Sequence, residues 1–367
     1  MNYLDQTEIN NLLNKEDLTE QEGHCVSLVV DLIKKSLENY YSIPIEIQRG
    51  SKIVSLEENY YILGYDRNEV TLGERYTKYV SSTHILRTQM TSSIPSLLQN
   101  HPQNCNKIYL CPGIVYRRDV KDKTHVGEPH QMDIWMLNQD QSTRNDLLNL
   151  VNIIINIIEK SINKKIEWRY NETEHHYTEG GIEIEIKHQG QWLEILECGL
   201  ISKKLLSKYS LSHYSGLALG LGLERLVMLI KGIDDIRVLK DERPEIQKQM
   251  MDLKKYKIVS KQPSTKRDLS IAIDKNINEE ELTELILKSV DKDTQNKIET
   301  IQIVTETYYD DLVDIAKERL GINPEQKNIL LRITLRDLVK SIESETANEI
   351  YTLIYNNIHK GTTGYYL

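Results

Sequence analysis

Phenylalanine is absent from this sequence: none of the 367 residues is Phe, whereas 21 are Tyr. The four cysteines show neither CxxC spacing nor a nearby His-x-His pattern, so neither a zinc site nor a disulfide framework is indicated. The N-terminal residues lack the basic and apolar regions of a signal peptide, and no apolar run approaches membrane-spanning length. We therefore expect a cytoplasmic protein that does not associate with a membrane.

A basic charge excess is also missing, because the formal net charge at pH 7 is −9. Proteins that bind nucleic acid through bulk electrostatics normally carry a basic surface. Any contact with RNA must therefore depend on a few locally placed residues. The apolar content is ordinary for a globular protein, and the chain is long enough for two or three domains.

The hydrophobic periodicity predicts both helices and strands. Apolar residues recur at three- and four-residue spacing in the helical segments, whereas the strand segments are alternating or continuously apolar. Because several strands follow one another without alternating helices, we expect an α+β fold with an antiparallel sheet flanked by helices. The predicted helices are 19–40, 83–99 and 143–162; the segment 42–63 is predicted to be extended; and the predicted strands are 107–116, 131–138, 181–186 and 191–198.

A charged loop joins two of these strands within the segment 113–137. Apolar runs precede and follow it, which is the pattern of two strands connected by a loop. A loop of this kind between apolar strands is a common place for a polar ligand to bind. Its charged or titratable residues are Arg117, Arg118, Asp119, Lys121, Asp122, Lys123 and His125.

A glycine-rich stretch, 213–230, precedes an apolar helix that contains Glu224 and Arg225. It is not a dinucleotide-binding fingerprint, since the G-x-G-x-x-G spacing and the acidic residue on a following strand are absent. Two interpretations remain open. The glycines could let a strand approach a flat ligand while Arg225 reaches a phosphate from the first helical turn. Alternatively, Arg225 is a buried arginine paired with a carboxylate.

The composition becomes more charged after Arg237, which predicts a linking helix that ends near Lys257. The segment 258–367 then has the strand and helix order β-α-β-β-α-β of a ferredoxin-like, split βαβ domain. Acidic residues outnumber basic ones in this segment. RNA binding by this domain would therefore need a few placed residues, and the candidates are Lys266, Arg267, Arg332 and Arg336.

Several motifs together resemble one enzyme family. The segment 115–135 (VYRRDVKDKTHVGEPHQMDIW) resembles motif 2 of class II aminoacyl-tRNA synthetases in its phenylalanyl form. The segment 216–229 (GLALGLGLERLVML) resembles motif 3, and 192–201 (WLEILECGLI) resembles the strand between them. The similarity runs over roughly 80–367 in the family's order, and the last domain resembles the anticodon-binding domain of the single-chain, organellar-type phenylalanyl enzyme.

This resemblance implies the domain organisation. We expect an N-terminal helical segment followed by an antiparallel class II catalytic domain flanked by helices, a linker helix and a ferredoxin-like anticodon-binding domain. The oligomeric state is expected to be a monomer or a homodimer. The corresponding residue ranges are 1–45, 46–235, 236–257 and 258–367.

The implied reaction joins an amino acid, phenylalanine or an analogue, to tRNA through an adenylate formed with ATP and Mg²⁺. Such sites need groups that stabilise negative charge on phosphorus, which suits arginines and a metal ion. By resemblance, Arg117 and Arg225 are the catalytic residues: Arg117 holds the α-phosphate and the substrate carboxylate, and Arg225 holds the γ-phosphate. The remaining expected ATP contacts are Asp119, His125 and Gly222.

The resemblance also implies an amino-acid pocket. Gln131 and Asp133 would bind the α-amino group, and either Thr91 or Ser92 would supply a hydroxyl. The other expected pocket residues are His175, Tyr177, Ala218 and Gly220. Glu185 and Glu197 are the carboxylates expected to hold Mg²⁺.

The pocket departs from the family pattern in two places. Asp133 stands where the family usually has Glu, and Ile134 and Trp135 follow it instead of a small residue. The family's Phe-Pro-Phe, which clasps the substrate ring, is replaced by 175–177 (HHY). Either Tyr177 supplies the aromatic edge and the specificity is kept, or His175 marks a more polar substrate, because a buried polar group discriminates strongly when it is paired.

The absence of Phe bears on the same question, because chance omission over this length is implausible. We hypothesise that the protein is made when Phe codons are unreliable. Either charged tRNA for Phe is scarce at that time, or this enzyme loads that tRNA with another amino acid. The alternatives to a phenylalanine-type enzyme are a paralogue with altered specificity, tyrosine-like or polar, and a non-catalytic tRNA-binding or carrier-loading relative.

Overall fold

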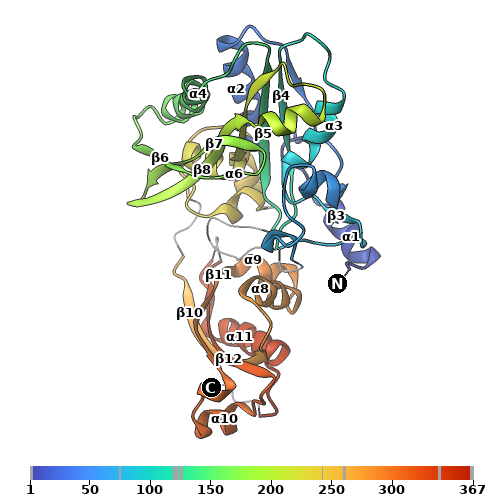
Figure 1. Cartoon of the computed structure of the whole chain (residues 1–367). Coiled ribbons are helices and arrows are strands. Elements are labelled where there is room, and N and C mark those ends of the chain that lie inside the picture. Colours follow the sequence, from blue (N-terminus) through green and yellow to red (C-terminus); the bar gives the residue numbers. More distant parts are fainter. Residues whose placement is uncertain are drawn as a thin grey trace. The chain divides into compact units, whose positions relative to one another are not determined.

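The chain divides into two compact units in a computed structural model (Figure 1). The first unit comprises Met1–Arg117 and Glu128–Tyr256, and the second comprises Arg118–Gly127 and Lys257–Leu367. Each unit has its own hydrophobic core, so each is treated separately. The structure describes residues 3–73, 76–118, 123, 127–241, 243–258, 262–337 and 340–363.

In the described part of the first unit, seven strands form one sheet in the order β1-β4-β5-β9-β8-β7-β6. β1 and β4 pair in parallel, and each other neighbouring pair is antiparallel. This mostly antiparallel sheet with flanking helices confirms the predicted α+β class. The strands are β1 Ile45–Ile47, β4 Lys107–Ile114, β5 His130–Asn138, β6 Trp168–Glu172, β7 Thr178–His188, β8 Gln191–Ile201 and β9 Ser215–Gly222.

Helices of the first unit pack against this sheet. α2, α4 and α6 contact one another, α6 lies against β5, and α4 lies against β8. Leucine and isoleucine side chains of α3 and α5 pack separately with Tyr109, Trp135 and Ala218 of the sheet. The helices are α1 Gln6–Leu13, α2 Cys25–Tyr40, α3 Ile94–Gln99, α4 Arg144–Ile162, α5 Lys203–Lys208, α6 Leu223–Lys231 and α7 Pro244–Met250.

The two long helices of this unit confirm the helices predicted at 19–40 and 143–162. α4 begins with a capping box, in which Thr143 accepts the backbone N–H of Asp146 and Asp146 accepts the backbone N–H of Thr143. It ends at Asn163, which adopts the left-handed conformation that frequently terminates a helix. Between these ends, the leucines, isoleucines and valine of the buried face recur at helical spacing.

Two predictions for the N-terminal half were wrong. Within the segment predicted to be extended, Glu57–Tyr61 is a π-helical turn between β2 (Ile53–Ser55) and later turns. Reciprocal hydrogen bonds between Ser55 and Glu58 start this turn as a capping box does. A helix was predicted at 83–99, but His84–Leu86 form strand β3, because these residues pair with β2. A 3₁₀ turn follows β3, and only then does the chain form the helix α3.

The linker also differs from its prediction. A single helix ending near Lys257 was expected, whereas the chain forms a 3₁₀ turn at Ile236–Lys240 and then the short helix α7. Pro244 is at the first turn of α7, where its missing N–H costs no helical hydrogen bond. The elements α1, α5 and β6 were not predicted either.

The second unit has a three-stranded sheet among its described residues, in the order β10-β12-β11. Both pairs are antiparallel, so β10 and β11 run parallel on either side of β12. β10, α8, β11, β12 and α11 match the first five elements of the predicted β-α-β-β-α-β order, with α9 and α10 as additional helices. The predicted last strand comes after α11, where the tail 364–367 lies outside the described residues. The elements are β10 Thr265–Asp274, α8 Glu279–Lys288, α9 Lys292–Lys297, β11 Ile298–Tyr308, α10 Asp314–Leu320, β12 Gln326–Leu335 and α11 Ser344–Ile358.

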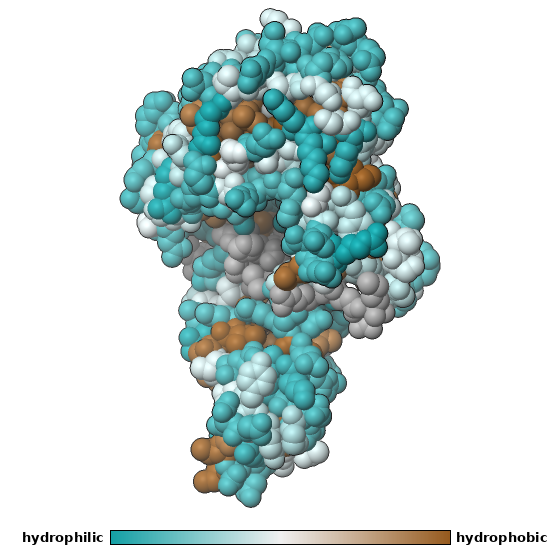
Figure 2. Space-filling view, viewed as in Figure 1, coloured by the Kyte–Doolittle hydropathy of each residue, from teal (hydrophilic) through white to brown (hydrophobic). Residues whose placement is uncertain are grey.

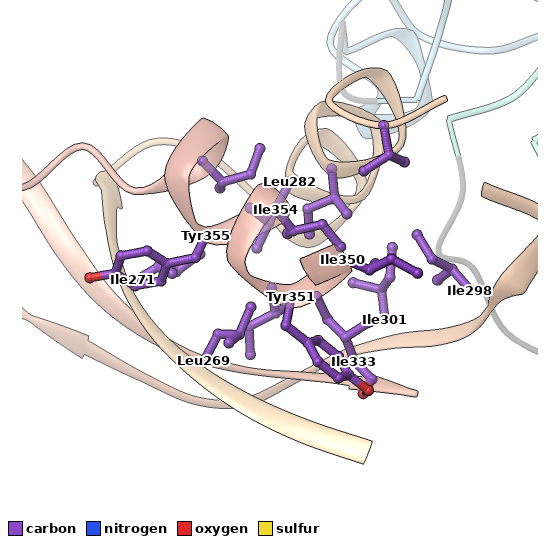
Figure 3. Packing of buried hydrophobic residues seen from close by; sticks show 14 of the residues in the cluster. Leu269, Ile271, Leu282, Ile298, Ile301, Ile333, Ile350, Tyr351, Ile354 and Tyr355 are labelled. Carbon is purple, nitrogen blue, oxygen red and sulfur yellow. The ribbon is translucent and has the colours of Figure 1, made fainter. Parts of the chain in front are cut away.

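A single aliphatic core holds this second sheet to its helices (Figure 3). Alternate residues of the strands, such as Leu269, Ile301 and Ile333, face Leu282 of α8 and Ile354 of α11. The opposite side of these strands carries polar and charged residues. Helices α8 and α11 cover one face of the small sheet, and on the other face Ala272 of β10 is buried with Leu320 of α10 and Ile322.

The visible molecular surface is largely hydrophilic, with small and separated apolar areas (Figure 2). Within the part of the chain that the structure describes, no helix combines the length and the apolar character needed to span a bilayer.

Candidate active site

A row of aligned residues crosses strands β5, β9, β8 and β7. Asp133 of β5 is the Cα partner of Gly220 on β9, which is the partner of Glu197 on β8, which in turn pairs with Glu183 on β7. Directly paired residues of neighbouring strands point to the same face of a sheet. The three carboxylates therefore share one face, and Gly220 leaves the space between Asp133 and Glu197 free of a side chain.

Asp133 is buried and hydrogen-bonded on this face. Its Oδ2 accepts a hydrogen bond from Thr91 Oγ1 at 2.7 Å and a longer one from Trp135 Nε1 at 3.4 Å. Burial raises the pKa of Asp133 to about 6, although these two hydrogen bonds and the charge of Arg117 oppose the shift. A carboxylate in this state gains most from a cationic partner, such as a substrate ammonium group.

Arg117 lies next to this row. Its Nε donates a 2.7 Å hydrogen bond to the carbonyl oxygen of Thr88, which orients the guanidinium. Its positive charge acts on Asp133 and on Glu197. The positive charge of Arg117 thus reaches the carboxylates of this row.

Arg225, in the first turn of α6, is held by Glu194 of β8. Its Nη1 donates to the Glu194 carbonyl oxygen at 2.9 Å and lies 3.6 Å from a carboxylate oxygen of the same residue. Burial raises the pKa of Glu194, against the charge of Arg225. Arg225 therefore contacts a carboxylate, as one interpretation predicts, and it lies in the first turn of α6, from which the other interpretation has it reach a phosphate.

Glu194 was not singled out from the sequence. Glu194 lies in 191–198 (QWLEILEC), which does not alternate, because the neighbouring Ile195 and Leu196 are both buried at a change of register between β7 and β8. Periodicity therefore does not assign Glu194 to a face, and it does not reveal which arginine approaches it.

An aromatic stack forms one wall beside Asp133. The Tyr177 ring lies on the Trp135 ring, with centroids 5.8 Å apart, and the His175 ring lies 6.0 Å from Tyr177. His175 Nε2 is 3.1 Å from Glu197 Oε2, and its Nδ1 is 3.1 Å from Thr178 Oγ1. These rings line a narrow cavity of about 20 Å³ beside Asp133, which is room for about one water molecule.

The other expected pocket residues have distinct surroundings. Thr91, not Ser92, meets Asp133; the Ser92 hydroxyl donates to the carbonyl oxygen of Gln89 at 2.9 Å. Gln131 is paired with Gly222, and Ala218 with Trp135, so both lie along the same two strands as Asp133 and Gly220. Asp119 and His125, which were expected to contact ATP, lie outside the described residues.

The two expected metal ligands are not equivalent. Glu185 Oε2 accepts hydrogen bonds from Arg169 Nε at 2.6 Å and Asn171 Nδ2 at 2.8 Å, both from β6. Glu197 instead lies in the row with Asp133, near Glu194. Among the described residues, no group of three or more His, Cys, Asp or Glu side chains is arranged to hold a metal ion. Mg²⁺ is commonly bound by only one or two protein carboxylates together with substrate phosphates. Glu194 and Glu197 could serve as such carboxylates, whereas Glu185 is already hydrogen-bonded to Arg169 and Asn171.

A buried polar network behind the site was also not predicted. His130 Nδ1 lies 2.6 Å from Glu224 Oε1, and the His130 backbone N–H donates to the same carboxylate at 2.8 Å. His130 Nε2 accepts the Leu18 N–H at 3.0 Å, so the ring proton is on Nδ1. Asp17, in turn, accepts the Ile114 N–H at 3.0 Å. These contacts join the N-terminal segment, the end of β4, the start of β5 and the first turn of α6.

The four candidate RNA contacts of the second unit differ in their surroundings. Lys266 and Arg267 are exposed at the start of β10. Arg332 makes two 2.7 Å hydrogen bonds to Asp268 across the sheet. Arg336 contacts Glu299 and donates to the Gln262 carbonyl oxygen at 2.6 Å. Part of the basic charge of this unit is therefore already balanced by its own carboxylates.

The chain matches the family model of the tRNA synthetases class II core domain (F) over residues 10–250. It belongs to the class II aminoacyl-tRNA synthetases. This membership confirms the resemblance inferred from the segments 115–135, 192–201 and 216–229. Asp133, Arg117 and Arg225 all lie within the matched region of this synthetase.

Several curated proteins are similar to this synthetase. It is 29% identical to the phenylalanine–tRNA ligase alpha subunit of Hamiltonella defensa, over 58% of this chain and 63% of that protein. It is 27% identical to the mitochondrial phenylalanine–tRNA ligase of Saccharomyces cerevisiae, over 75% of this chain and 76% of that protein. For the chloroplastic/mitochondrial enzyme of Arabidopsis thaliana the identity is 25%, over 94% of this chain and 78% of that protein.

The chain thus spans less than two thirds of the bacterial subunit and about three quarters of the two organellar proteins. Among solved structures, it is similar to a pyrrolysyl tRNA synthetase from Desulfitobacterium hafniense, with a TM-score of 0.45, 14% identity, and coverage of 64% of this chain and 78% of that one.

Proposed function

We propose that this synthetase catalyses the ATP-dependent aminoacylation of a tRNA through an aminoacyl-adenylate, as a ligase of the phenylalanine type. Family membership and the phenylalanine–tRNA ligase relatives support this reaction. The observation that carries the proposal is the buried Asp133, on which the charge of Arg117 acts, in the same sheet as Glu194, which holds Arg225. The substrates would be ATP, phenylalanine or an analogue, and tRNA.

In the first step, a carboxylate oxygen of the amino acid attacks the α-phosphorus of ATP. The bond from that phosphorus to the bridging oxygen breaks, and pyrophosphate leaves. Asp133 and Gln131 would hold the α-amino group, which fixes the direction of the attacking carboxylate. Arg117 would stabilise the negative charge that develops at the α-phosphate, and Arg225 that on the departing phosphates.

Mg²⁺ would offset phosphate charge in this step, and Glu194 and Glu197 are the carboxylates whose positions fit a role in holding it. Arg225 contacts Glu194, so the same residue would orient both the arginine and the metal side of the site. ATP contacts by Gly222, Asp119 and His125 remain part of the proposal. A metal role for Glu185 is less favoured, because Arg169 and Asn171 already occupy its carboxylate.

In the second step, a hydroxyl of the terminal tRNA ribose attacks the adenylate carbonyl and releases AMP. The C-terminal unit would bind the anticodon region, with Lys266 and Arg267 as the exposed cations of β10. The split βαβ order of its described strands supports such a role. The cytoplasmic location and the monomeric or homodimeric state remain predictions.

Aminoacylation of tRNA tests this function directly. The purified chain is incubated with ATP, Mg²⁺, total tRNA and a panel of labelled amino acids, and label bound to tRNA is counted. We expect at least one amino acid to be transferred, and Arg117→Ala to abolish transfer. A chain that binds tRNA would instead be a non-catalytic relative if no amino acid of the panel were transferred and none caused release of pyrophosphate.

A further inference from the structure

The carbonyl oxygen of Thr88 orients the Arg117 guanidinium, since it accepts the Nε proton at 2.7 Å. Thr88 itself lies in a bend between strand β3 and the 3₁₀ turn Met90–Ser93. A bend has no hydrogen-bond ladder of its own, so the backbone groups of Thr88 depend on contacts from elsewhere in the chain. The residues that hold Thr88 therefore also set the direction of Arg117.

A single side chain, Asn59, holds Thr88 at two points. Asn59 Oδ1 accepts the Thr88 backbone N–H at 3.2 Å, and Asn59 Nδ2 donates to Thr88 Oγ1 at 2.8 Å. The backbone N–H can only donate, which assigns the oxygen of the amide to it and the nitrogen to the hydroxyl. Asn59 is 0% exposed, so water does not compete for either contact.

The backbone of Asn59 holds the next residue as well. Asn59 lies in the π-helical turn Glu57–Tyr61, and its carbonyl oxygen accepts a hydrogen bond from Gln89 Nε2 at 2.7 Å. The Thr88 carbonyl belongs to the peptide unit that joins Thr88 to Gln89. Both residues of that unit are thus tied to Asn59, one through the Asn59 amide and the other through the Gln89 side chain.

The Thr88 hydroxyl is also part of a buried chain of hydrogen bonds. Thr77 Oγ1 donates to the Thr71 carbonyl oxygen at 2.7 Å, and the Tyr60 hydroxyl donates on the same side, 2.7 Å from Thr77 Oγ1. Burial raises the pKa of Tyr60, so the phenol keeps its proton at neutral pH. The Tyr60 oxygen then accepts the Thr88 hydroxyl proton at 3.1 Å, and the Thr88 oxygen accepts from Asn59. Each donor around Thr88 is therefore matched to an acceptor in one arrangement.

We propose that Asn59 is a positioning residue for adenylate formation: by fixing Thr88, it holds the Arg117 guanidinium in the direction that stabilises negative charge at the α-phosphate of ATP. This inference rests on the proposed function, since it explains how an arginine of that site is held. Stabilisation of a transition state depends on donors that are aligned before the reaction begins. Without Asn59 the guanidinium keeps its charge but loses this alignment, so the chemical step slows while the substrates still bind.

The catalytic rate of Asn59→Leu tests the proposal. ATP–pyrophosphate exchange is measured with phenylalanine and with tyrosine, in protein whose folding is verified by circular dichroism and thermal unfolding. We expect kcat to fall by about 10- to 100-fold and the KM for ATP to change by less than about 3-fold, because an alignment used in the transition state is lost. A purely structural role would lower the unfolding temperature and leave the kcat of the folded protein unchanged, which would overturn the proposal.

Variants of Thr88 test the same link and replace Asn59→Leu if that protein does not fold. Thr88→Val removes the hydroxyl that Asn59 and Tyr60 contact, whereas Thr88→Ser keeps it. We expect kcat to fall about 5-fold in Thr88→Val and to be largely restored in Thr88→Ser, and equal kcat values in the two would contradict the proposal. Asn138→Leu is the matched control, because it also removes an amide hydrogen bond, from Asn138 Nδ2 to Ser142 Oγ, and it should leave kcat unchanged.

A double-mutant cycle tests whether Asn59 acts through Arg117. Arg117→Lys keeps a positive charge but has no guanidinium for the Thr88 carbonyl to orient. In this background Asn59→Leu should reduce kcat by less than about 2-fold, since the group that it positions is already lost. A reduction as large as in the protein that retains Arg117 would mean that Asn59 acts by another route, and the proposal would be wrong.

The outcomes also separate this inference from the proposed function. If the unmodified protein catalyses exchange and kcat is unchanged in folded Asn59→Leu, the positioning role is wrong and the ligase function stands. If the unmodified protein catalyses no exchange with any amino acid and transfers none to tRNA, the proposed function and this inference both fail.

Discussion

His130 Nδ1 lies 2.6 Å from Glu224 Oε1, and this buried contact joins the strand that carries Asp133 to the helix that carries Arg225. The two side chains are 0% and 2% exposed, so water does not compete for the hydrogen bond. The Glu224 carboxylate also accepts the backbone N–H of His130, which fixes the first residue of β5. The relative positions of the proposed amino-acid and phosphate contacts therefore depend on a pair that touches neither substrate.

Loss of the Glu224 carboxylate should destabilise the protein and reduce its activity. Glu224→Ala leaves two donors of His130 buried without an acceptor, at a cost of about 1–3 kcal/mol for each group. Glu224→Gln keeps one acceptor oxygen and should be less harmful. Thermal unfolding and the KM for ATP in pyrophosphate exchange measure the two effects, with the exposed Glu245→Ala as the control. A Glu224→Ala protein as stable as the unmodified one would contradict the assigned role.

Replacement of Asp133 should stabilise the fold at neutral pH while it impairs amino-acid binding. The pKa of this carboxyl is raised from 3.8 to about 6 by burial. Below pH 3.8 the carboxyl is protonated in the folded and in the unfolded protein. Between pH 3.8 and about 6 the folded protein keeps a proton that the unfolded protein releases, so the free energy of unfolding falls as the pH rises. The shift corresponds to at most about 3 kcal/mol, fully expressed above pH 6.

The Asp133→Asn protein should not lose stability in this way, because the uncharged amide oxygen can accept the hydrogen bonds from Thr91 and Trp135. Its stability relative to the unmodified protein should increase between about pH 4 and about pH 7, as denaturant unfolding at several pH values measures. The KM for the amino acid should rise in the same variant. A stability difference independent of pH would show that the carboxyl does not titrate in this window.

The charge balance of the second unit predicts how tRNA binding responds to substitution. Lys266→Gln removes an exposed cation and should weaken binding, with a smaller dependence on salt. Asp268→Asn should strengthen binding, because Arg332 loses the carboxylate that it now contacts through two hydrogen bonds. Affinity for total tRNA is measured at several salt concentrations, with Lys275→Gln at the other end of β10 as the control. If tRNA binding had the same salt dependence in all three variants, this face of the sheet would not be the tRNA-binding surface.

The sequence motifs were sufficient to identify the family and the central strands of the site. The segment 131–138 predicts β5, and the glycine-bearing 213–230 predicts β9 with α6, because apolar periodicity and glycine placement are local properties. The roles of Arg117, Asp133 and Arg225 were inferred from the resemblance to the synthetase family and not from periodicity, and they remain proposals.

Contacts between distant segments could not be predicted from the same patterns. His130 and Glu224 are 94 residues apart, and a single buried histidine has no periodic signature. The Ser55–Glu58 capping interaction gave a turn where alternation suggested an extended chain, and pairing of His84–Leu86 with β2 replaced a predicted helical start. In each case a specific hydrogen-bonding partner outweighed local propensity.

Activation of an amino acid with ATP is the reaction that the proposed catalytic site must perform. ATP–pyrophosphate exchange should require an added amino acid and Mg²⁺, and Arg225→Lys should reduce it on the order of 100-fold, since an ammonium cannot reproduce the forked contacts of a guanidinium. A folded protein that shows no exchange with any amino acid, or exchange that is unchanged in Arg225→Lys, would contradict the proposed catalytic site.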